Sequence, residues 1–494
     1  MRGVCARRQF DRGLRAVVPG SYLDIDELTL RAEALVSAYP GRATLRRIGS
    51  SRAGEPIRLL SVGRGSRHVL VVAGPHANEP VGGVTVLRLA RHLANADARA
   101  DEKPGAKANG DASAKVNGGA GAEAYRSSAG PADTVWHFVL SLDPDGARRN
   151  ERWLKGPMTM EHHFRNFFRP GFAAQPEWLP TAPGARPLPE TRALLDIQDE
   201  LRPYLQCSLH SADVGGGFVQ LTRRLPGLSG PLLRSAGDLG IPVELGPYDA
   251  FFWPSPGPGV FDMPRPEETD QFSSLPSATA TSTWFHPHRY GTVTAVVEAP
   301  MWAVDAVGDA SPHPDPHGAL DTIGGTLRGD ARLLSGLLEQ VRAGLPATAG
   351  PLLAPIDEYL GVSPGLADEW ASEAVRGPAP AAGRPGRTPP MNRARVMTLR
   401  IAARRLMARS AGLMHQLLAD GGDGPTGAAA HDVRTAVDRF LTERCQSFEA
   451  DCRARWVPVR DQAEHQFRVV LAASELAAGA PGIADSPRTR TVRT

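Results

Sequence analysis

The sequence predicts an α/β protein with an additional helical region toward its carboxyl end. Residues 69–73 are continuously apolar, as in a strand that is buried on both faces of a sheet, and residues 292–297 are mostly β-branched, as is typical of strands. Segments with helical spacing of apolar residues alternate with such runs over the first three hundred residues or so. From residue 393 onward, helical spacing alone recurs.

The composition is that of a globular chain with a substantial core. Its 494 residues suffice for two or three domains, and 41% of them are hydrophobic. The 56 basic and 53 acidic residues nearly balance, which argues against nucleic-acid binding through bulk charge. Because the chain shows neither a signal-like apolar segment nor a run of 18 apolar residues, we expect a cytoplasmic protein that does not bind membranes.

The first predicted elements are a helix and a pair of strands. Residues 24–39 carry leucines at helical spacing behind an aspartate cap and stop before a Pro-Gly pair. Residues 43–48 and 57–62 are strand-like, and the segment between them is rich in Ser, Gly and Pro. This pattern predicts a hairpin with an extended loop.

The next strand leads into the first candidate metal ligands. The apolar run 69–73 is followed by His76 and Glu79, and then by an apolar helix over residues 84–93. An imidazole nitrogen and a carboxylate oxygen three residues apart can both bind one Zn²⁺ ion. The H-x-x-E pattern alone arises often by chance, so its weight comes from its position at a strand end.

Three further strands also end in polar groups. Residues 135–142 run into a predicted turn, Asp-Pro-Asp-Gly, that begins at Asp143. A short strand over residues 206–209 leads to His210, and the strand 292–297 leads to Glu298. The elements predicted between these strand ends are helices over 190–201 and 231–239, a strand over 217–222 and an irregular region over 248–287.

Shifts in composition predict the organisation of the chain. The first predicted unit is an α/β unit over 1–310, which contains a disordered insertion at 95–133. A connecting helical segment at 311–376, with a helix over 331–343, and a Pro/Gly/Arg-rich linker at 377–392 follow it. The chain then continues with a helical hairpin or bundle at 393–480 and a disordered tail at 481–494. Helices are predicted there over 395–418, 433–452 and 461–476. Six arginines precede or lie on the first of these helices, namely Arg393, Arg395, Arg400, Arg404, Arg405 and Arg409. They could bind an acidic partner, although a solvated helix face is the simpler interpretation.

Taken together, the motifs resemble the zinc carboxypeptidase family, the M14 peptidases. The segments GPHANEP, DPDGARRN, FRNFF, SLHSAD and VVEAP follow the family's order of H-x-x-E, N-P-D-G turn, arginine, N-R-N-F, lone histidine and glutamate over about residues 40–305. The resemblance implies a three-layer α/β/α sandwich around a mixed sheet. It also implies a site at the carboxyl ends of the strands, in agreement with the rule for open α/β sheets.

The resemblance further implies the roles of four residues. His76, Glu79 and His210 would hold one zinc ion per chain and leave a fourth position open for water, as in catalytic zinc sites. Glu298 would be the general base that takes a proton from water and passes it to the leaving amine. The predicted function is therefore that of a zinc metallopeptidase of carboxypeptidase type, which hydrolyses a C-terminal peptide bond.

Arginines complete the implied site. Arg165 matches the family's clamp for the substrate carboxylate, a task that suits a guanidinium fork. Arg148 matches the arginine that stabilises the oxyanion, with Arg152 as the alternative. The family's preceding asparagine is replaced by Phe164, which predicts a clamp that is weaker or rebuilt.

Other departures leave alternatives open. Asp143 begins the turn where the family has asparagine, and neither Tyr248 nor Tyr290 can be assigned as the family's mobile tyrosine. A sister chemistry is an amidohydrolase or deacylase that acts on a small acyl-amino acid or a cell-wall peptide. A metal-free scaffold that binds a partner through its helices is the third alternative. The expected partner is accordingly a peptide or acyl-amino-acid substrate, and the partner of the helical region is unknown.

Overall fold

The computed structural model describes residues 21–100, 130–182 except 132, 184–266, 274, 279–372, 375, 391–419 and 428–480. Within these residues the strands are β1 (Ala43–Ser50), β2 (Pro56–Val62), β3 (Arg67–Val72), β4 (Thr134–Val139), β5 (Leu205–Gly215), β6 (Phe218–Leu221), β7 (Val260–Asp262), β8 (Val293–Ala303) and β9 (Arg455–Trp456). They form a nine-stranded sheet in the order β1-β2-β4-β3-β5-β8-β6-β7, with β9 paired to β8. The predicted hairpin of β1 and β2 is present.

The sheet is mixed, and its central strands are parallel. β3 runs parallel to both β4 and β5, and β5 runs parallel to β8. The pairs β1/β2, β2/β4 and β6/β8 are antiparallel. Every residue of β5 and β8 is buried, including polar residues such as Gln206, Ser208 and Thr294. The carboxyl ends of β3, β5 and β8 therefore lie beside one another at one edge of the sheet.

Helices cover both faces of this sheet. The helices are α2 (Ile25–Ala38), α3 (Val81–Ala100), α5 (Pro144–Leu154), α6 (Met160–Asn166), α7 (Pro189–Leu201), α8 (Ser229–Leu239), α9 (Pro316–Arg342), α10 (Gly350–Trp370), α12 (Arg393–Ala419), α13 (Ala428–Cys452) and α14 (Val459–Gly479). One hydrophobic core joins the sheet to α2, α3, α8 and α14, and a separate core joins its opposite face to α7. The predicted α/β/α arrangement with an added helical region is confirmed.

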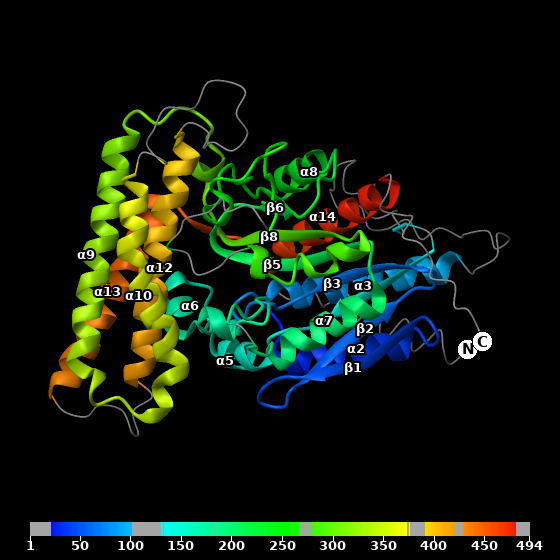
Figure 1. Ribbon diagram of the computed structural model, residues 1–494, viewed down its shortest axis with the longest axis horizontal. Helices are drawn as coiled ribbons and strands as arrows, with labels where there is room; N and C mark the ends of the chain where they lie inside the picture. The colour runs from blue at the N-terminus through cyan, green and yellow to red at the C-terminus, as the bar shows by residue number, and fades with distance from the viewer. Residues whose placement is uncertain are drawn as a thin grey trace.

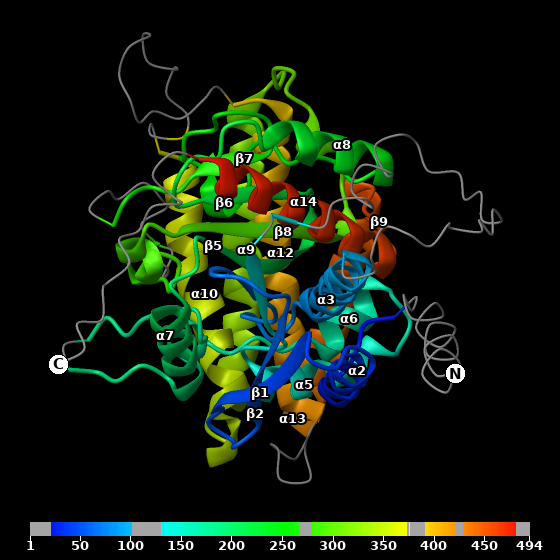
Figure 2. The same ribbon diagram turned by 90° about the vertical axis from the view of Figure 1, so that its right-hand side faces the viewer.

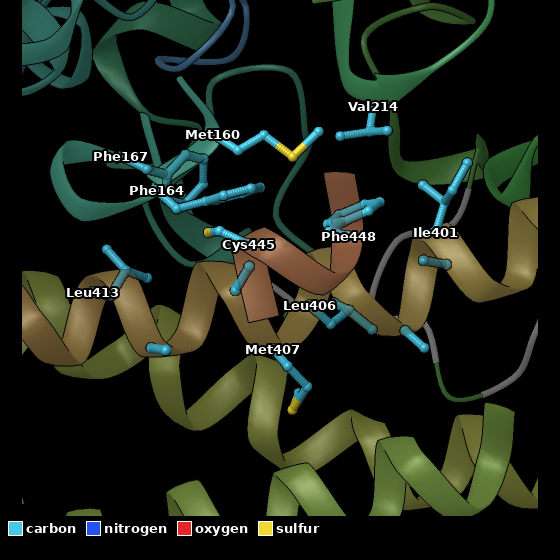
Figure 3. Close-up of a cluster of buried hydrophobic side chains, with 14 of the residues drawn as sticks. Met160, Phe164, Phe167, Val214, Ile401, Leu406, Met407, Leu413, Cys445 and Phe448 are labelled. Atoms are coloured by element: carbon cyan, nitrogen blue, oxygen red, sulfur yellow. The ribbon is translucent and has the colours of Figure 1, made fainter. Parts of the chain in front are cut away.

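The helices α9, α10, α12 and α13 form a bundle beside one end of the sheet (Figure 1). Its apolar core continues into α6, because Met160, Phe164 and Phe167 pack against α12 and α13 (Figure 3). Val214 of β5 belongs to the same cluster. The bundle is therefore joined to the α/β part through a shared core.

The helix α14 departs from the predicted grouping of residues 393–480. It packs against α3, α8 and β8 and lies on the same side of the sheet as α3 (Figure 2). Its residues Val469, Val470 and Leu471 are fully buried in the core of that face. The apolar pattern of the helix predicted its existence but could not show which surface it covers.

Other boundaries also differ from the sequence-based expectation. Asp143-Pro144-Asp145-Gly146 is not a free turn but the start of α5, because the Asp143 side chain accepts a hydrogen bond from the Gly146 amide at 3.0 Å. The helix α10, which contains two prolines, was not individually predicted. Residues 95–100 of the expected insertion belong to α3. Most of that insertion, residues 377–390 of the linker and the tail 481–494 lie outside the described residues. No helix in the described ranges has the length and apolarity needed to cross a membrane.

Candidate active site

The first two candidate ligands lie in the turn between β3 and α3. The Glu79 amide donates a hydrogen bond to the His76 carbonyl at 3.1 Å, which closes the turn. Both side chains are buried, with exposed fractions of 6% for His76 and 4% for Glu79. The strand end and the helix start thus hold an imidazole and a carboxylate in the interior of the protein.

His210 and Glu298 are brought together by the pairing of two neighbouring parallel strands. His210 of β5 lies directly opposite Glu298 of β8 in the register of the two strands. The distance from His210 Nδ1 to Glu298 Oε1 is 3.8 Å. Residues 88 positions apart in the sequence are neighbours because each lies at the same level of adjacent strands.

The two histidines and Glu79 form a compact set of donor atoms. His76 Nδ1 lies 3.1 Å from Glu79 Oε1, and His210 Nδ1 lies 3.2 Å from Glu79 Oε2. The two imidazole rings meet edge to face, with their centroids 4.6 Å apart. Two nitrogens and a carboxylate are the donor set of a catalytic zinc site, so these residues fit the implied metal.

A second carboxylate, Glu177, was missed by sequence reasoning. It follows the short 3-10 helix Phe172–Ala174, and its Oε2 atom lies 3.4 Å from His76 Nε2 and 3.3 Å from His210 Nε2. Its Oε1 atom accepts hydrogen bonds from the Ser208 hydroxyl at 2.8 Å and the Trp284 indole at 2.5 Å. No spacing pattern connects Glu177 with either histidine, so the sequence offered no signal for it.

The two carboxylates define two sides of the histidine pair. On one side Glu177 faces both Nε2 atoms, and its distances would allow a second donor set of His76, Glu177 and His210. On the other side Glu79 faces both Nδ1 atoms. His76, Glu79, His210 and Glu298 border a cavity of about 190 Å³, whereas Glu177 does not. Among the described residues, this cavity is bordered by Glu79 and Glu298 and not by Glu177, which favours Glu79 as the ligand and Glu177 as the outer partner of both rings.

Electrostatics favour a positive charge between these groups. Burial by itself would raise the pKa of Glu79, but His76 and His210 hold that pKa well below its usual value. Burial likewise opposes ionisation of Glu177, yet chiefly His210 lowers the pKa of Glu177 to about 2. Two carboxylates that remain ionised in a buried site attract a cation.

The candidate base Glu298 has the opposite tendency. Burial raises the pKa of Glu298 to about 8, and this exceeds the opposing effect of the His210 charge, with Glu79 adding to the rise. A carboxyl group whose pKa lies near neutrality can both accept and release a proton during turnover. The position of Glu298 on the cavity wall is compatible with this role.

Arg148 and Arg152 do not border the cavity. Arg148 forms ion pairs with Asp26, Glu55 and Glu151 at distances of 2.8 to 3.2 Å. Arg152 is exposed on α5. The oxyanion role expected of either arginine does not fit these positions, because neither side chain lines the cavity that His76 and His210 border.

Arg165, expected to bind the substrate carboxylate, also lies elsewhere. It pairs with Glu161 at 2.9 Å and with Asp438 of α13 at 3.0 Å, and it donates a hydrogen bond to Thr442 at 3.0 Å. Its guanidinium thus joins α6 to the bundle and is not among the residues that line the cavity. Phe164 is fully buried in the same interface, where an asparagine amide would have lacked water.

Three other arginines border the cavity instead: Arg169, Arg405 and Arg409. Arg169 Nη1 lies 3.2 Å from Glu79 Oε1, and Arg409 is paired with the buried Asp213 at 2.6 Å. Arg169 lies outside the four-residue FRNF match, and the other two belong to α12, so the motif comparison could not select them. Tyr248 also borders the cavity, whereas Tyr290 bonds to Asp199 at 3.0 Å away from it.

Residues 31–109 match a family model described as zinc carboxypeptidase. This segment of the chain is similar to the zinc carboxypeptidases. The matched segment contains His76 and Glu79, and it ends before His210, Glu298 and the helical bundle. No curated protein matches the chain.

The solved structures to which the chain shows some similarity include carboxypeptidases. The metallo-carboxypeptidase from Burkholderia cenocepacia is 16% identical, with a TM-score of 0.35 over 58% of this chain and 62% of its own. Carboxypeptidase A from Helicoverpa armigera is 14% identical, with a TM-score of 0.34 over 57% and 65%. Bovine thrombin-activatable fibrinolysis inhibitor is 12% identical, with a TM-score of 0.31 over 56% and 86%. The chain thus spans less than two thirds of the length of the first two.

Proposed function

We propose that this protein is a zinc-dependent metallopeptidase of carboxypeptidase type that hydrolyses a C-terminal peptide bond. The observation that carries the proposal is the convergence of two imidazole Nδ1 atoms and the Glu79 carboxylate at the edge of a cavity, with Glu298 beside them. His76, Glu79 and His210 would hold the ion. Zinc in such a site supplies Lewis-acid polarisation of a carbonyl group and acidifies bound water.

The protein's own groups would carry the proton transfers. Glu298 would take a proton from the attacking water and pass it to the nitrogen of the leaving amine. Its buried position, which raises its pKa to about 8, makes the protonated form accessible at neutral pH. Glu177 would accept the Nε2 protons of both histidines, so that each Nδ1 lone pair points toward the ion.

Arg169 would take over the oxyanion role that the sequence suggested for Arg148 or Arg152. Its guanidinium borders the cavity and lies 3.2 Å from Glu79, within the same buried cluster as the histidines. A fixed cation in a cavity of low polarity stabilises the negative charge that develops on a carbonyl oxygen. No rearrangement of α5 or α6 is then needed to bring an arginine to the site.

The size of the cavity favours a second candidate, an amidohydrolase or deacylase that acts on a small acyl-amino acid. The space of about 190 Å³ between the sheet and the helices is smaller than the 300 Å³ or so of typical ligand sites. Both candidates break an amide bond with the same groups. They differ in what lies on the acyl side, so the relative kcat/KM for dipeptides and for N-acetyl amino acids separates them.

Removal of the proposed ligands tests the metal site. The variants His76→Ala and His210→Ala should lose both bound zinc and hydrolytic activity, because each leaves an incomplete ligand set. The variant His431→Ala, which changes an exposed histidine on α13, should keep both. Zinc content would be measured by mass spectrometry after dialysis. Retention of stoichiometric zinc by either ligand variant would refute the assignment of the ligands, whereas a wild-type protein that binds no zinc would favour the metal-free scaffold.

A further inference from the structure

One face of α12 forms part of the cavity wall. The residues that line the cavity from this helix are Thr398, Ile401, Ala402, Arg405, Leu406 and Arg409. Their spacing of three and four residues places them on a single face of the helix. The arginines of this segment had been considered as a surface for an acidic partner, but two of them face the site.

The position of α12 relative to the histidine pair is fixed by a buried ion pair. Arg409 Nη2 lies 2.6 Å from Asp213 Oδ2, and Arg409 Nε donates to the same oxygen at 2.8 Å. Asp213 is fully buried on β5, three residues after His210. Breaking a buried ion pair leaves an uncompensated charge, so this contact fixes the position of α12 relative to β5. Arg405 lies one helical turn before Arg409 and is held at the same wall.

Arg405 differs from the other two cavity arginines in its partners. Arg169 is bound to Glu79 and Gln175, and Arg409 is bound to Asp213. Among the residues that the structure describes, Arg405 has neither an ion pair nor a hydrogen bond, and its Nε atom is buried. A guanidinium group that is partly removed from water and has no partner can bind an anion with little competition from protein groups.

The nearby carboxylates do not take this role. Glu244 is buried, and its two oxygens accept hydrogen bonds from the Gly216 amide at 2.9 Å and the Thr398 hydroxyl at 3.0 Å. Glu298 faces His210, and Asp249 lies in the short helix Tyr248–Ala250, with no ion pair to Arg405 among the described residues. Arg405 acts on Glu244 and Glu298 only through longer-range electrostatics. Its donors therefore remain available to a ligand.

The remaining lining of the cavity indicates what such a ligand looks like. Phe218, Trp253 and Trp284 give the wall an aromatic character. A cavity of about 150 Å³ can hold benzene, so about 190 Å³ has space for one apolar side chain with its backbone groups. Charge and shape thus match a single apolar amino acid with a free carboxylate.

We propose that Arg405 of α12 binds the free carboxylate of the substrate, and that the substrate class is an amide whose leaving group is a single apolar amino acid. This inference rests on the proposed function, since it assigns the leaving group to the same site. It gives the helical bundle a direct part in specificity. It also accounts for Arg165 and Phe164, whose positions are used instead to attach α6 to the bundle.

The test measures binding of the leaving group and needs no turnover. L-phenylalanine and L-phenylalaninamide would be titrated into the full-length protein by calorimetry, once with zinc and once after removal of metal. Wild type should bind the free acid about 10- to 100-fold more tightly than the amide, because the amide cannot form the charge-assisted hydrogen bonds. The metal-free titration excludes a carboxylate that binds the zinc ion itself.

Three variants complete the test. Arg405→Met should remove most of the preference for the acid, and Arg405→Lys should keep part of it because an ammonium group is a point charge without the planar fork. Arg400→Met removes an arginine from the same helix that does not line the cavity, and it should retain the preference. An unchanged preference in Arg405→Met, or equal binding of acid and amide by metal-free wild type, would overturn the proposal. Failure of the wild-type protein to bind zinc would instead count against the proposed function. The metal-free titration would still test whether Arg405 binds the carboxylate.

Discussion

Replacement of Glu177 by glutamine tests how the two histidines are oriented. The Glu177 carboxylate is surrounded by four donors, namely His76 Nε2, His210 Nε2, the Ser208 hydroxyl and the Trp284 indole. Glutamine keeps the shape of the side chain but brings an NH₂ group into this ring of donors. At least one histidine then loses the acceptor for its Nε2 proton and is free to adopt the tautomer that blocks Nδ1.

The expected effect follows from the number of histidines that Glu177 contacts. Loss of an outer partner of a single metal ligand typically weakens metal binding by about 10- to 100-fold. Because Glu177 faces both rings, we expect the upper end of this range, about 100-fold or about 2.8 kcal/mol in zinc affinity. The dissociation constant would be measured by competition with a chelating dye of known affinity.

Two comparison variants make the result specific. Glu358→Gln changes another carboxylate of the cavity wall that does not contact the histidines, and its zinc affinity should remain within about threefold of wild type. Glu79→Gln removes a proposed ligand and should weaken binding more than Glu177→Gln does. If Glu177→Gln binds zinc as wild type does, the orienting role is wrong. If it loses more affinity than Glu79→Gln, Glu177 is itself the ligand.

Three further predictions concern the base, the helical region and a buried acid. Glu298→Gln should keep zinc while kcat falls by roughly 10² or more, and a near wild-type rate would show that another group is the base. A fragment that ends near residue 375 should not fold, because it lacks α14, whose residues Val469, Val470 and Leu471 are buried against the sheet. Their burial contributes roughly 5 to 9 kcal/mol to the free energy of unfolding. A monomeric fragment with a cooperative melting transition would contradict this prediction. Burial raises the pKa of Glu244 to about 7, so its protonated form is favoured in the folded state, and stability should fall as pH rises from about 4.5 through 7. Glu244→Gln should lessen this loss by on the order of 3 kcal/mol, measured as the free energy of unfolding in urea at pH 5 and at pH 8. An equal change in the free energy of unfolding between the two pH values in both proteins would refute the role given to Glu244.

Local patterns in the sequence predicted most strands of the sheet and four candidate site residues, but they missed β9, and β7 lies in the region 248–287 that was expected to be irregular. Strand-like segments that lead to His76, His210 or Glu298 predicted both the strands and the edge at which these side chains gather. The edge could be predicted because the carboxyl ends of parallel strands lie together, and polar groups placed there can meet a ligand. Glu79 was found because it lies one turn from His76.

The tertiary structure decided the groups that approach this edge from distant segments. Glu177 comes from an irregular segment, and Arg169 lies just beyond the matched motif. Arg405 lies 107 residues beyond Glu298, on α12. Nothing in their local sequence distinguishes them from surface residues, because their roles depend on which helix packs against which strand. The same reason explains Arg165: its motif was visible, but the packing of α6 on the bundle turns its guanidinium toward Asp438 and away from the cavity.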